Sequence, residues 1–265
     1  MTFLLKFDTM KKLDAFLAEF RAFGYSIVDL SDFDFLNHCT SIFKEVLGVE
    51  DLYNCHIKIT NEEINDRRIN VFREINKIPD WESKLFSSYK TYLEGLLGPD
   101  MAIQLKLNPS IQMPSDQNSI LEMHSDSLSG QSYFEVVCWT PITHAESTNS
   151  MFIFDRYISG EIIRDMPEFE SQGMTHLFRK YASHAKFLKM SPGQGLIFSS
   201  TLLHGNVLND TSQTRMSVNC RFKNLFAPEF EQYESERKLG TFYKLFSLSP
   251  VTELALASKE RAIEF

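Results

Sequence analysis

The chain has 265 residues, of which 43% are hydrophobic and 13% aromatic, and its formal net charge is −8 at pH 7. This length is sufficient for one large domain with a substantial core, and the acidic balance argues against a nucleic-acid partner because phosphate binding needs a basic surface. Four scattered cysteines without a CxxC pair indicate neither a zinc knuckle nor a disulfide framework, and are typical of free thiols in a reducing cytoplasm.

The first hundred residues are predicted to be mostly helical, because apolar side chains recur there at helical spacing and a glycine follows each run as a stop signal. Thr9 is placed to cap the first helix and Gly24 to end it. The apolar run at residues 3–5 is too short for a signal sequence. The expected elements are the helix between Thr9 and Gly24, a strand over 25–30, a helix over 32–47 that ends at Gly48, and a helix over 80–97 that Gly98 follows.

After Gly98 the pattern changes to short branched or aromatic runs separated by proline and glycine, which favours an all-β barrel or sandwich. The charged stretch over 161–182 is interpreted as an insertion or helical excursion. From Pro228 onward a helix is predicted again, with Glu229 and Glu231 in its first turn. Strands are expected over 102–107, 133–140, 151–154, 186–190, 195–199 and 216–222.

The chain is therefore predicted to form a single domain over 1–265 that is mainly β with flanking α-helices. Helical N-terminal support over 1–100 precedes a β core over 101–224, and a helical C-terminal segment over 225–265 follows. No run approaches the roughly 18 apolar residues of a membrane span, so we expect a cytoplasmic protein without a membrane partner. The charge does not decide the oligomeric state, and a homodimer is compatible with it.

His124-Ser125-Asp126 is an H-x-D element, which in a strand would direct an imidazole and a carboxylate to the same face. With a second, distant histidine this element would complete a facial 2-His-1-carboxylate triad, the arrangement that suits non-haem Fe(II). The element alone is a weak signal, since the acidic content gives about one H-x-[DE] by chance and His144-Ala145-Glu146 is a second example.

The segment over 191–222 selects the first of the two elements. A Pro-Gly turn leads into an apolar strand that delivers His204, and Arg215 follows eleven residues later with Ser217 on the same strand face. A dicarboxylate co-substrate would chelate the metal with one end and need a fixed cation at the other, which an arginine fork provides. Asn149 and Arg221 are polar positions within or beside apolar strands, and a structural role is favoured for both.

These residues carry a resemblance to the phytanoyl-CoA dioxygenase-like superfamily, and within it to the StrG-like oxygenases of streptomycin biosynthesis and sporadic bacterial carbohydrate clusters. The resemblance covers roughly 95–225. The segments that carry it are LLGPDMAIQLKLNPSIQMP (96–114), MHSDSLSGQSYFEVVCWTPIT (123–143), TNSMFIF (148–154) and residues 191–222, with a looser likeness at GYSIVD (24–29).

The resemblance implies a double-stranded β-helix, or jelly roll, and an Fe(II)-, 2-oxoglutarate- and O2-dependent dioxygenase. His124 and Asp126 would lie early in that core and His204 late, with about four strands between them. The metal ligands would be these three residues, which are also the catalytic set. Arg215 and Ser217 would anchor 2-oxoglutarate, and the remaining candidates for the co-substrate pocket are Asn206, Trp139 and Gln104.

The resemblance also implies a small polar metabolite as substrate, such as a sugar or nucleotide-sugar in carbohydrate or natural-product biosynthesis. Two alternatives remain open from the residues. A cupin-like metal-dependent isomerase or hydrolase would use the triad without oxygen and make Arg215 incidental. A non-catalytic jelly-roll sugar-binding protein would carry a vestigial site.

Overall fold

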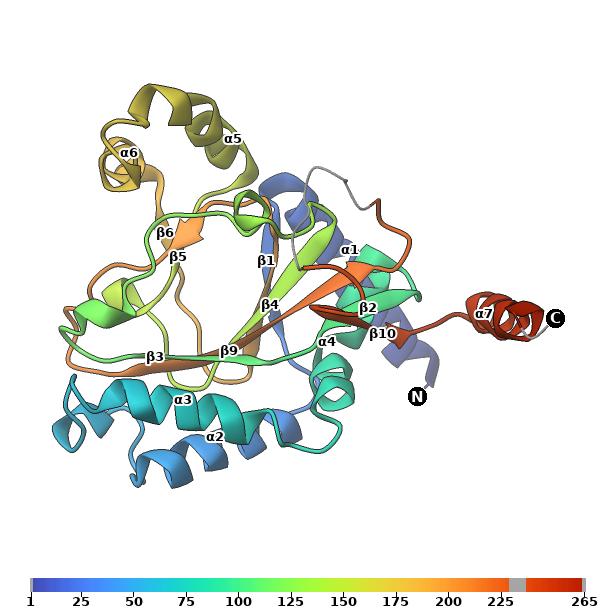
Figure 1. The fold of residues 1–265 in the computed structure, drawn as a ribbon, viewed down its shortest axis with the longest axis horizontal. Coiled ribbons are helices and arrows are strands. Elements are labelled where there is room, and N and C mark those ends of the chain that lie inside the picture. Colours follow the sequence, from blue (N-terminus) through green and yellow to red (C-terminus); the bar gives the residue numbers. More distant parts are fainter. Residues whose placement is uncertain (1, 229–236, 264–265) are drawn as a thin grey trace.

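The structure, a computed structural model, describes residues 2–228 and 237–263, and its strands form two antiparallel sheets (Figure 1). The larger sheet has the order β1-β7-β4-β9-β2-β10, with β3 also paired to β9, and the smaller has the order β6-β5-β8. The strands are β1 (Tyr25–Asp29), β2 (Met101–Gln104), β3 (Asn108–Gln112), β4 (Glu135–Pro141), β5 (Phe152–Ile153), β6 (Lys186–Phe187), β7 (Gln194–Ser199), β8 (His204–Gly205), β9 (Arg215–Asn224) and β10 (Tyr243–Ser247).

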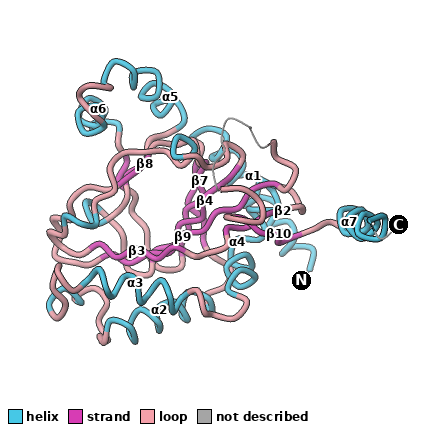
Figure 2. Tube along the Cα trace, viewed as in Figure 1, coloured by secondary structure: helices cyan, strands magenta, loops and turns pink. Residues whose placement is uncertain are grey.

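Helices pack on both sides of this pair of sheets (Figure 2). Helices α2, α3 and α4 lie under the larger sheet, α5 and α6 lie beyond the smaller one, and α7 extends away from both. No helix in the described part of the chain is long and apolar enough to cross a membrane. The helices are α1 (Thr2–Phe23), α2 (Asp34–Leu47), α3 (Ile64–Ile75), α4 (Trp81–Leu97), α5 (Arg156–Asp165), α6 (Met174–Tyr181) and α7 (Pro250–Ile263).

Alternation along the strands divides the core into layers, because successive side chains of a strand point to opposite faces. On β4, Cys138 packs with the helices under the larger sheet, whereas Trp139 packs in the layer between the two sheets. On β5, Ile153 faces that same inner layer, whereas Phe152 packs with Leu177 of α6. The side chains between the two sheets therefore form a core layer of their own, separate from the two layers that the helices cover.

Several predicted elements are present near their predicted bounds. They are the strand after Gly24, the helices that end at Gly48 and Gly98, and the strands now named β2, β4, β5, β6, β7 and β9. Gly24 ends α1, as predicted. Its φ of +84° is a left-handed conformation that glycine adopts easily and that is strained for a residue with a Cβ. The 161–182 excursion is helical, formed by the end of α5, a 3-10 turn and α6.

Two predictions about the helical segments are wrong. Thr9 lies inside α1 and is not its N-cap, because the helix already begins at Thr2. The segment over 225–265 is not wholly helical, because β10 pairs with β2, where Tyr243 lies opposite Gln104. That pairing satisfies backbone groups of β2 that would otherwise form an open edge. The predicted helix start at Glu229 and Glu231 lies outside the described residues.

Candidate metal centre

Two histidines from distant parts of the chain lie side by side. His124 and His204 form an isolated antiparallel bridge, with N–H···O distances of 2.9 Å from His124 to His204 and 2.8 Å in the reverse direction. Their ring centroids are 4.4 Å apart. With Asp126 they form a group whose ligand-capable atoms all lie within 4.8 Å of one another. These are the three residues that the sequence predicts as metal ligands, and the fold brings them together.

Asp126 reaches the cluster by a route that differs from the prediction. The H-x-D element is not a strand, since Asp126 adopts helical φ and ψ angles of −61° and −39° and precedes a 3-10 turn over Ser127–Ser129. The chain therefore turns immediately after His124. The turn leaves Asp126 Oδ1 4.0 Å from His124 Nε2, so a tight turn replaces strand alternation as the cause of the convergence.

Hydrogen bonds to the backbone orient both imidazoles. Nδ1 of His124 lies 2.9 Å from the carbonyl of Glu122, and Nδ1 of His204 lies 3.0 Å from the carbonyl of Leu202. Because a carbonyl only accepts, each Nδ1 donates its proton to the backbone, which leaves Nε2 of each ring as the atom that can bind a metal. Burial lowers the pKa of His204 to about 4, so this ring is neutral at physiological pH and able to bind a metal.

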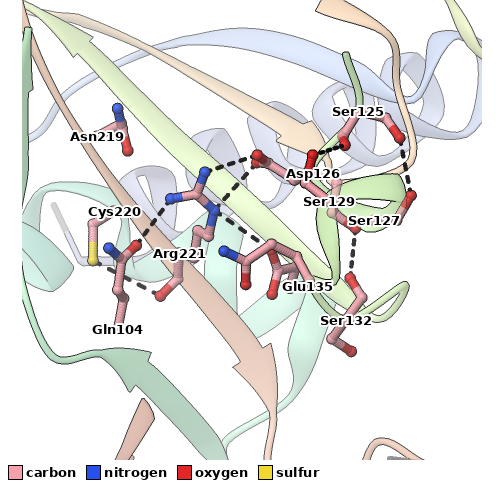
Figure 3. A network of polar contacts seen from close by, with 12 residues as sticks. Gln104, Ser125, Asp126, Ser127, Ser129, Ser132, Glu135, Asn219, Cys220 and Arg221 are labelled. Carbon is pink, nitrogen blue, oxygen red and sulfur yellow. Dashed lines mark hydrogen bonds and ion pairs between the residues drawn. The ribbon is translucent and has the colours of Figure 1, made fainter. Parts of the chain in front are cut away.

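The carboxylate of Asp126 is held by a guanidinium that the sequence did not assign to the site. Arg221 donates from Nε to Oδ2 at 3.2 Å and from Nη2 to Oδ1 at 2.8 Å (Figure 3). Burial is the largest single influence on the pKa of Asp126 and raises it. The positive charge of Arg221, its hydrogen bonds to the carboxylate and the two nearby histidines together outweigh burial, so the net pKa lies below the usual range. Asp126 is therefore ionised, as a metal ligand must be.

A cavity of about 170 Å³ connects the cluster to Arg215. Arg215 is only 3% exposed, and its four hydrogen bonds all go to uncharged acceptors. No carboxylate lies within ion-pair distance of it in the described residues. Burial, with repulsion from Arg68, lowers its pKa to about 10, so it remains a cation. The acceptors are the Asn149 carbonyl (3.0 Å), Ser110 Oγ (2.9 Å), Ser217 Oγ (3.0 Å) and Gln112 Oε1 (2.9 Å).

The other predicted pocket residues are placed as follows. Trp139 and Asn206 line the cavity, and the Arg215 guanidinium lies 5.8 Å from the Trp139 ring centroid. The Asn206 amide binds backbone groups of residues 119 and 121, so it also holds the adjacent wall. Ser217 contacts Arg215 and does not itself line the cavity. Gln104 does not line it either, and binds Nη1 of Arg221 at 3.2 Å.

The competing H-x-E element stays apart from the cluster. His144 is exposed and stacks on Tyr53, with ring centroids 5.8 Å apart. Glu146 pairs with Lys189 at 3.3 Å on the surface. Within the described ranges, no group of three metal-ligating side chains includes either residue. This placement agrees with the interpretation of these residues as a loop pair.

The role of Arg221 could have been found from the sequence. In the strand predicted over 216–222, apolar residues alternate with Arg215, Ser217, Asn219 and Arg221. Strand alternation places these four polar residues on one face, and three of them line the cavity: Arg215, Asn219 and Arg221. Treating Arg221 as structural overlooked this period of two, which extends the face already assigned to Arg215.

No protein-family model matches the sequence, and no curated protein matches it. Solved structures do match along most of the chain. The non-heme monooxygenase ThoJ in complex with nickel is 14% identical, with 92% of this chain and 94% of that chain covered at a TM-score of 0.52. HygX from Streptomyces hygroscopicus, with nickel and 2-oxoglutarate bound, is 12% identical, with 87% and 96% covered at 0.54. SnoN, a non-heme alpha-ketoglutarate-dependent epimerase from nogalamycin biosynthesis, is 13% identical, with 81% and 84% covered at 0.50.

At these identities the likeness establishes the fold. The chain shares its antiparallel architecture with structures described as non-heme oxygenases and 2-oxoglutarate-binding proteins. The activity has to be argued from the residues of the site itself.

Proposed function

We propose that this chain is an Fe(II)- and 2-oxoglutarate-dependent oxygenase, a single domain whose two sheets form a double-stranded β-helix around the site. His124, Asp126 and His204 would hold the metal, and Arg215, which Ser217 holds by a hydrogen bond, would bind the distal carboxylate of 2-oxoglutarate. One observation carries the proposal. A 2-His-1-carboxylate cluster and a buried guanidinium that has no carboxylate partner among the described residues lie in the same cavity. An uncompensated buried cation is costly, and a bound anion would offset that cost.

The donor set fits ferrous iron. Two imidazoles that offer Nε2 and one ionised carboxylate are the ligands of the facial triad, which leaves positions open on the metal. When bound, iron would supply O2 activation coupled to the oxidative decarboxylation of 2-oxoglutarate and to oxidation of the substrate. Imidazole and carboxylate groups also bind nickel, the metal named for two of the structural neighbours.

The chain's own residues bind, orient and exclude water. Arg215 presents a fixed fork for a carboxylate, and its hydrogen bonds to neutral groups hold that fork without cancelling its charge. The cavity that holds the cluster also has an apolar wall, formed by Val137, Met151 and Phe198. This wall keeps bulk water from the reacting groups, which strengthens the electrostatic contacts inside.

The primary substrate would approach the metal from the side of His124 and Leu121. The His124 side chain is 24% exposed, and Leu121 lines the cavity while being 56% exposed. We propose a small polar metabolite, a sugar or nucleotide-sugar, on the strength of the StrG-like resemblance. SnoN is described as an epimerase, so epimerisation and desaturation are outcomes to include with hydroxylation.

An anaerobic titration tests the proposal against its alternatives. Fe(II) protein is mixed with 2-oxoglutarate without O2, and a keto acid chelating iron through the open positions should give a visible charge-transfer band. The band should be absent in His204→Ala, the control, and admission of O2 to the wild type should yield succinate. Metal binding without a band would favour the cupin-like isomerase or hydrolase. No succinate, with sugar binding unchanged in His124→Ala/His204→Ala, would favour the non-catalytic binding protein.

A further inference from the structure

The arginine that holds Asp126 has a specific geometry. Its Nε and Nη2 donate two parallel hydrogen bonds, one to each carboxylate oxygen, at 3.2 and 2.8 Å (Figure 3). The Arg221 side chain is 14% exposed and that of Asp126 is 5% exposed, so water screens this pair weakly. The arrangement is the two-point fork that guanidinium and carboxylate groups form when both partners are fixed.

This fork limits how Asp126 can bind a metal. A carboxylate offers about four lone-pair sites, two on each oxygen. Two parallel hydrogen bonds occupy the pair of sites that lie side by side, and these are the sites that a metal chelated by both oxygens would need. Each oxygen keeps one site that points elsewhere. Of the two oxygens, Oδ1 lies 4.0 Å from His124 Nε2.

We propose that Arg221 is a positioning residue that confines Asp126 to single-oxygen ligation and thereby keeps about three metal positions open for co-substrate and O2. This inference rests on the proposed function, since it concerns the same metal site. Without the fork, Asp126 could rotate and chelate the ion with both oxygens. One of the positions that 2-oxoglutarate and O2 require would then be filled by protein.

Three strands hold the fork in place. Gln104 of β2 accepts from Nη1 at 3.2 Å, and Glu135 of β4 lies 3.6 Å from Nε. Tyr243 of β10 donates to the other oxygen of Glu135 and lies 3.0 Å from Gln131 Oε1. The nitrogens of the Arg221 guanidinium therefore all have partners, and Figure 3 shows Gln104, Glu135 and Asp126 around it. A surface ion pair would lack this support and would leave the carboxylate free to turn.

A charge-conserving variant separates positioning from simple ion pairing. Arg221→Lys keeps the positive charge beside Asp126 but loses the planar fork, because an ammonium is a point donor. If Arg221 acts only through its charge, the variant should leave metal coordination unchanged. If it acts through the fork, the variant should bind metal with altered coordination.

The experiment counts the exchangeable waters on bound Mn(II) by electron–nuclear double resonance, with the Mn(II) dissociation constant measured on the same samples. We expect about three waters in the wild type and about two in Arg221→Lys, with a dissociation constant within about threefold of the wild type. Arg215→Lys is the matched control, because it makes the same change to the other guanidinium of the cavity. We expect it to keep about three waters.

The outcomes distinguish this inference from the proposed function. Equal water counts in the wild type and in metal-loaded Arg221→Lys, or a wild-type count of two, would overturn the role of Arg221. A wild type that binds no Mn(II) through these ligands would instead overturn the proposed function. If Arg221→Lys does not fold, Arg221→Gln replaces it, since a carboxamide also cannot form the fork, and the same two counts decide.

Discussion

Arg215 and Arg221 lie six residues apart on β9, and both point into the same cavity, yet their surroundings differ in charge. Arg221 faces two carboxylates, Asp126 at 2.8 Å and Glu135 at 3.6 Å. Arg215 is at least as deeply buried and has only neutral partners among the described residues. One face of a single strand therefore holds two buried cations: Arg221, whose charge is balanced by carboxylates, and Arg215, which has no carboxylate partner among the described residues.

The difference shows what each guanidinium is for. A buried charge that loses its partner costs several kcal/mol, so a native fold retains an unpaired one only where another requirement outweighs the cost. The paired arginine is complete within the protein and holds another residue in position. The unpaired arginine is incomplete until an anion arrives. Burial alone would not separate these two roles, whereas the count of nearby carboxylates does.

The largest expected effect comes from removing the carboxylate that Arg221 holds. Asp126→Ala should raise the Fe(II) or Mn(II) dissociation constant by about 1,000-fold or more, because the triad loses its only anionic ligand. It should also lower the free energy of unfolding by about 3 kcal/mol, since Arg221 loses its closest counter-charge. Metal titration and urea unfolding measure the two effects.

Asp126→Asn is the matched control for the unfolding part of this prediction. The amide oxygen still accepts from Arg221, so stability should fall less than in Asp126→Ala, while metal affinity should fall in both. Retention of wild-type metal affinity in either variant would show that the ion does not need this carboxylate.

Replacing the unpaired arginine should have the next largest effect, and of a different kind. Arg215→Met should raise the dissociation constant for 2-oxoglutarate about 100-fold, equivalent to about 3 kcal/mol, through loss of two charge-assisted hydrogen bonds. The free energy of unfolding should change by no more than about 1 kcal/mol, because lost hydrogen bonds are balanced by relief from burying an unpaired cation. Metal affinity should not change.

Arg221→Met is the comparison variant, and it should lose about 3 kcal/mol of stability because Asp126 and Glu135 then lose the buried guanidinium that faces both of them. Isothermal titration and urea unfolding of the two variants provide the comparison. If both variants lose the same stability, the distinction between paired and unpaired guanidinium groups fails.

A smaller effect is expected where the unpaired arginine is steadied by a hydroxyl. Ser217→Ala removes the Oγ that accepts from Arg215 Nη1 at 3.0 Å. The dissociation constant for 2-oxoglutarate should rise about fivefold, which corresponds to about 1 kcal/mol for one hydrogen bond. Ser88→Ala, a buried serine of α4, is the control and should bind 2-oxoglutarate normally. An unchanged dissociation constant in Ser217→Ala would show that Arg215 binds 2-oxoglutarate without help from this hydroxyl.

The smallest effect concerns the pH dependence of stability that arises from Glu135, one of the two carboxylates facing Arg221. Burial raises the pKa of Glu135 to about 7, above its ordinary value of 4.5. The folded state then binds more protons than the unfolded state between these values, so stability falls as pH rises through 7. The loss between pH 6 and 8 should be about 1 kcal/mol. Glu135→Gln should flatten that profile in urea unfolding, and an equally steep profile would assign the effect to another group.

The parts of this site that the sequence predicts are those with local patterns. His204, Arg215 and Ser217 follow one another at a spacing typical of a diacid site, and strand alternation places the last two on one face. The convergence of His124 with His204 was inferred from residue chemistry, since nothing in the spacing of two positions 80 residues apart specifies a bridge between them. The tight turn at Asp126 was not predicted, because the H-x-D letters fit a strand equally well.

Two strands that the sequence did not predict depend on long-range pairing. Residues 243–247 form a strand because β2 offers them an edge, a fact absent from the local sequence. β3 was missed because Pro109 reads as a turn, although a proline is tolerated in a strand that, like β3, pairs on one side only. The position of Glu135 and Tyr243 around Arg221 follows from these pairings. The residues that support Asp126 through Arg221 therefore could not be predicted from local sequence patterns.

The most direct test of the central claim is a crystal structure of the protein grown without O2 in the presence of Mn(II) and 2-oxoglutarate. We predict one metal ion bound by His124 Nε2, His204 Nε2 and a single oxygen of Asp126, with the keto acid chelating it and its distal carboxylate paired with Arg215. A metal ion bound elsewhere, or a 2-oxoglutarate molecule whose distal carboxylate does not contact Arg215, would contradict the account.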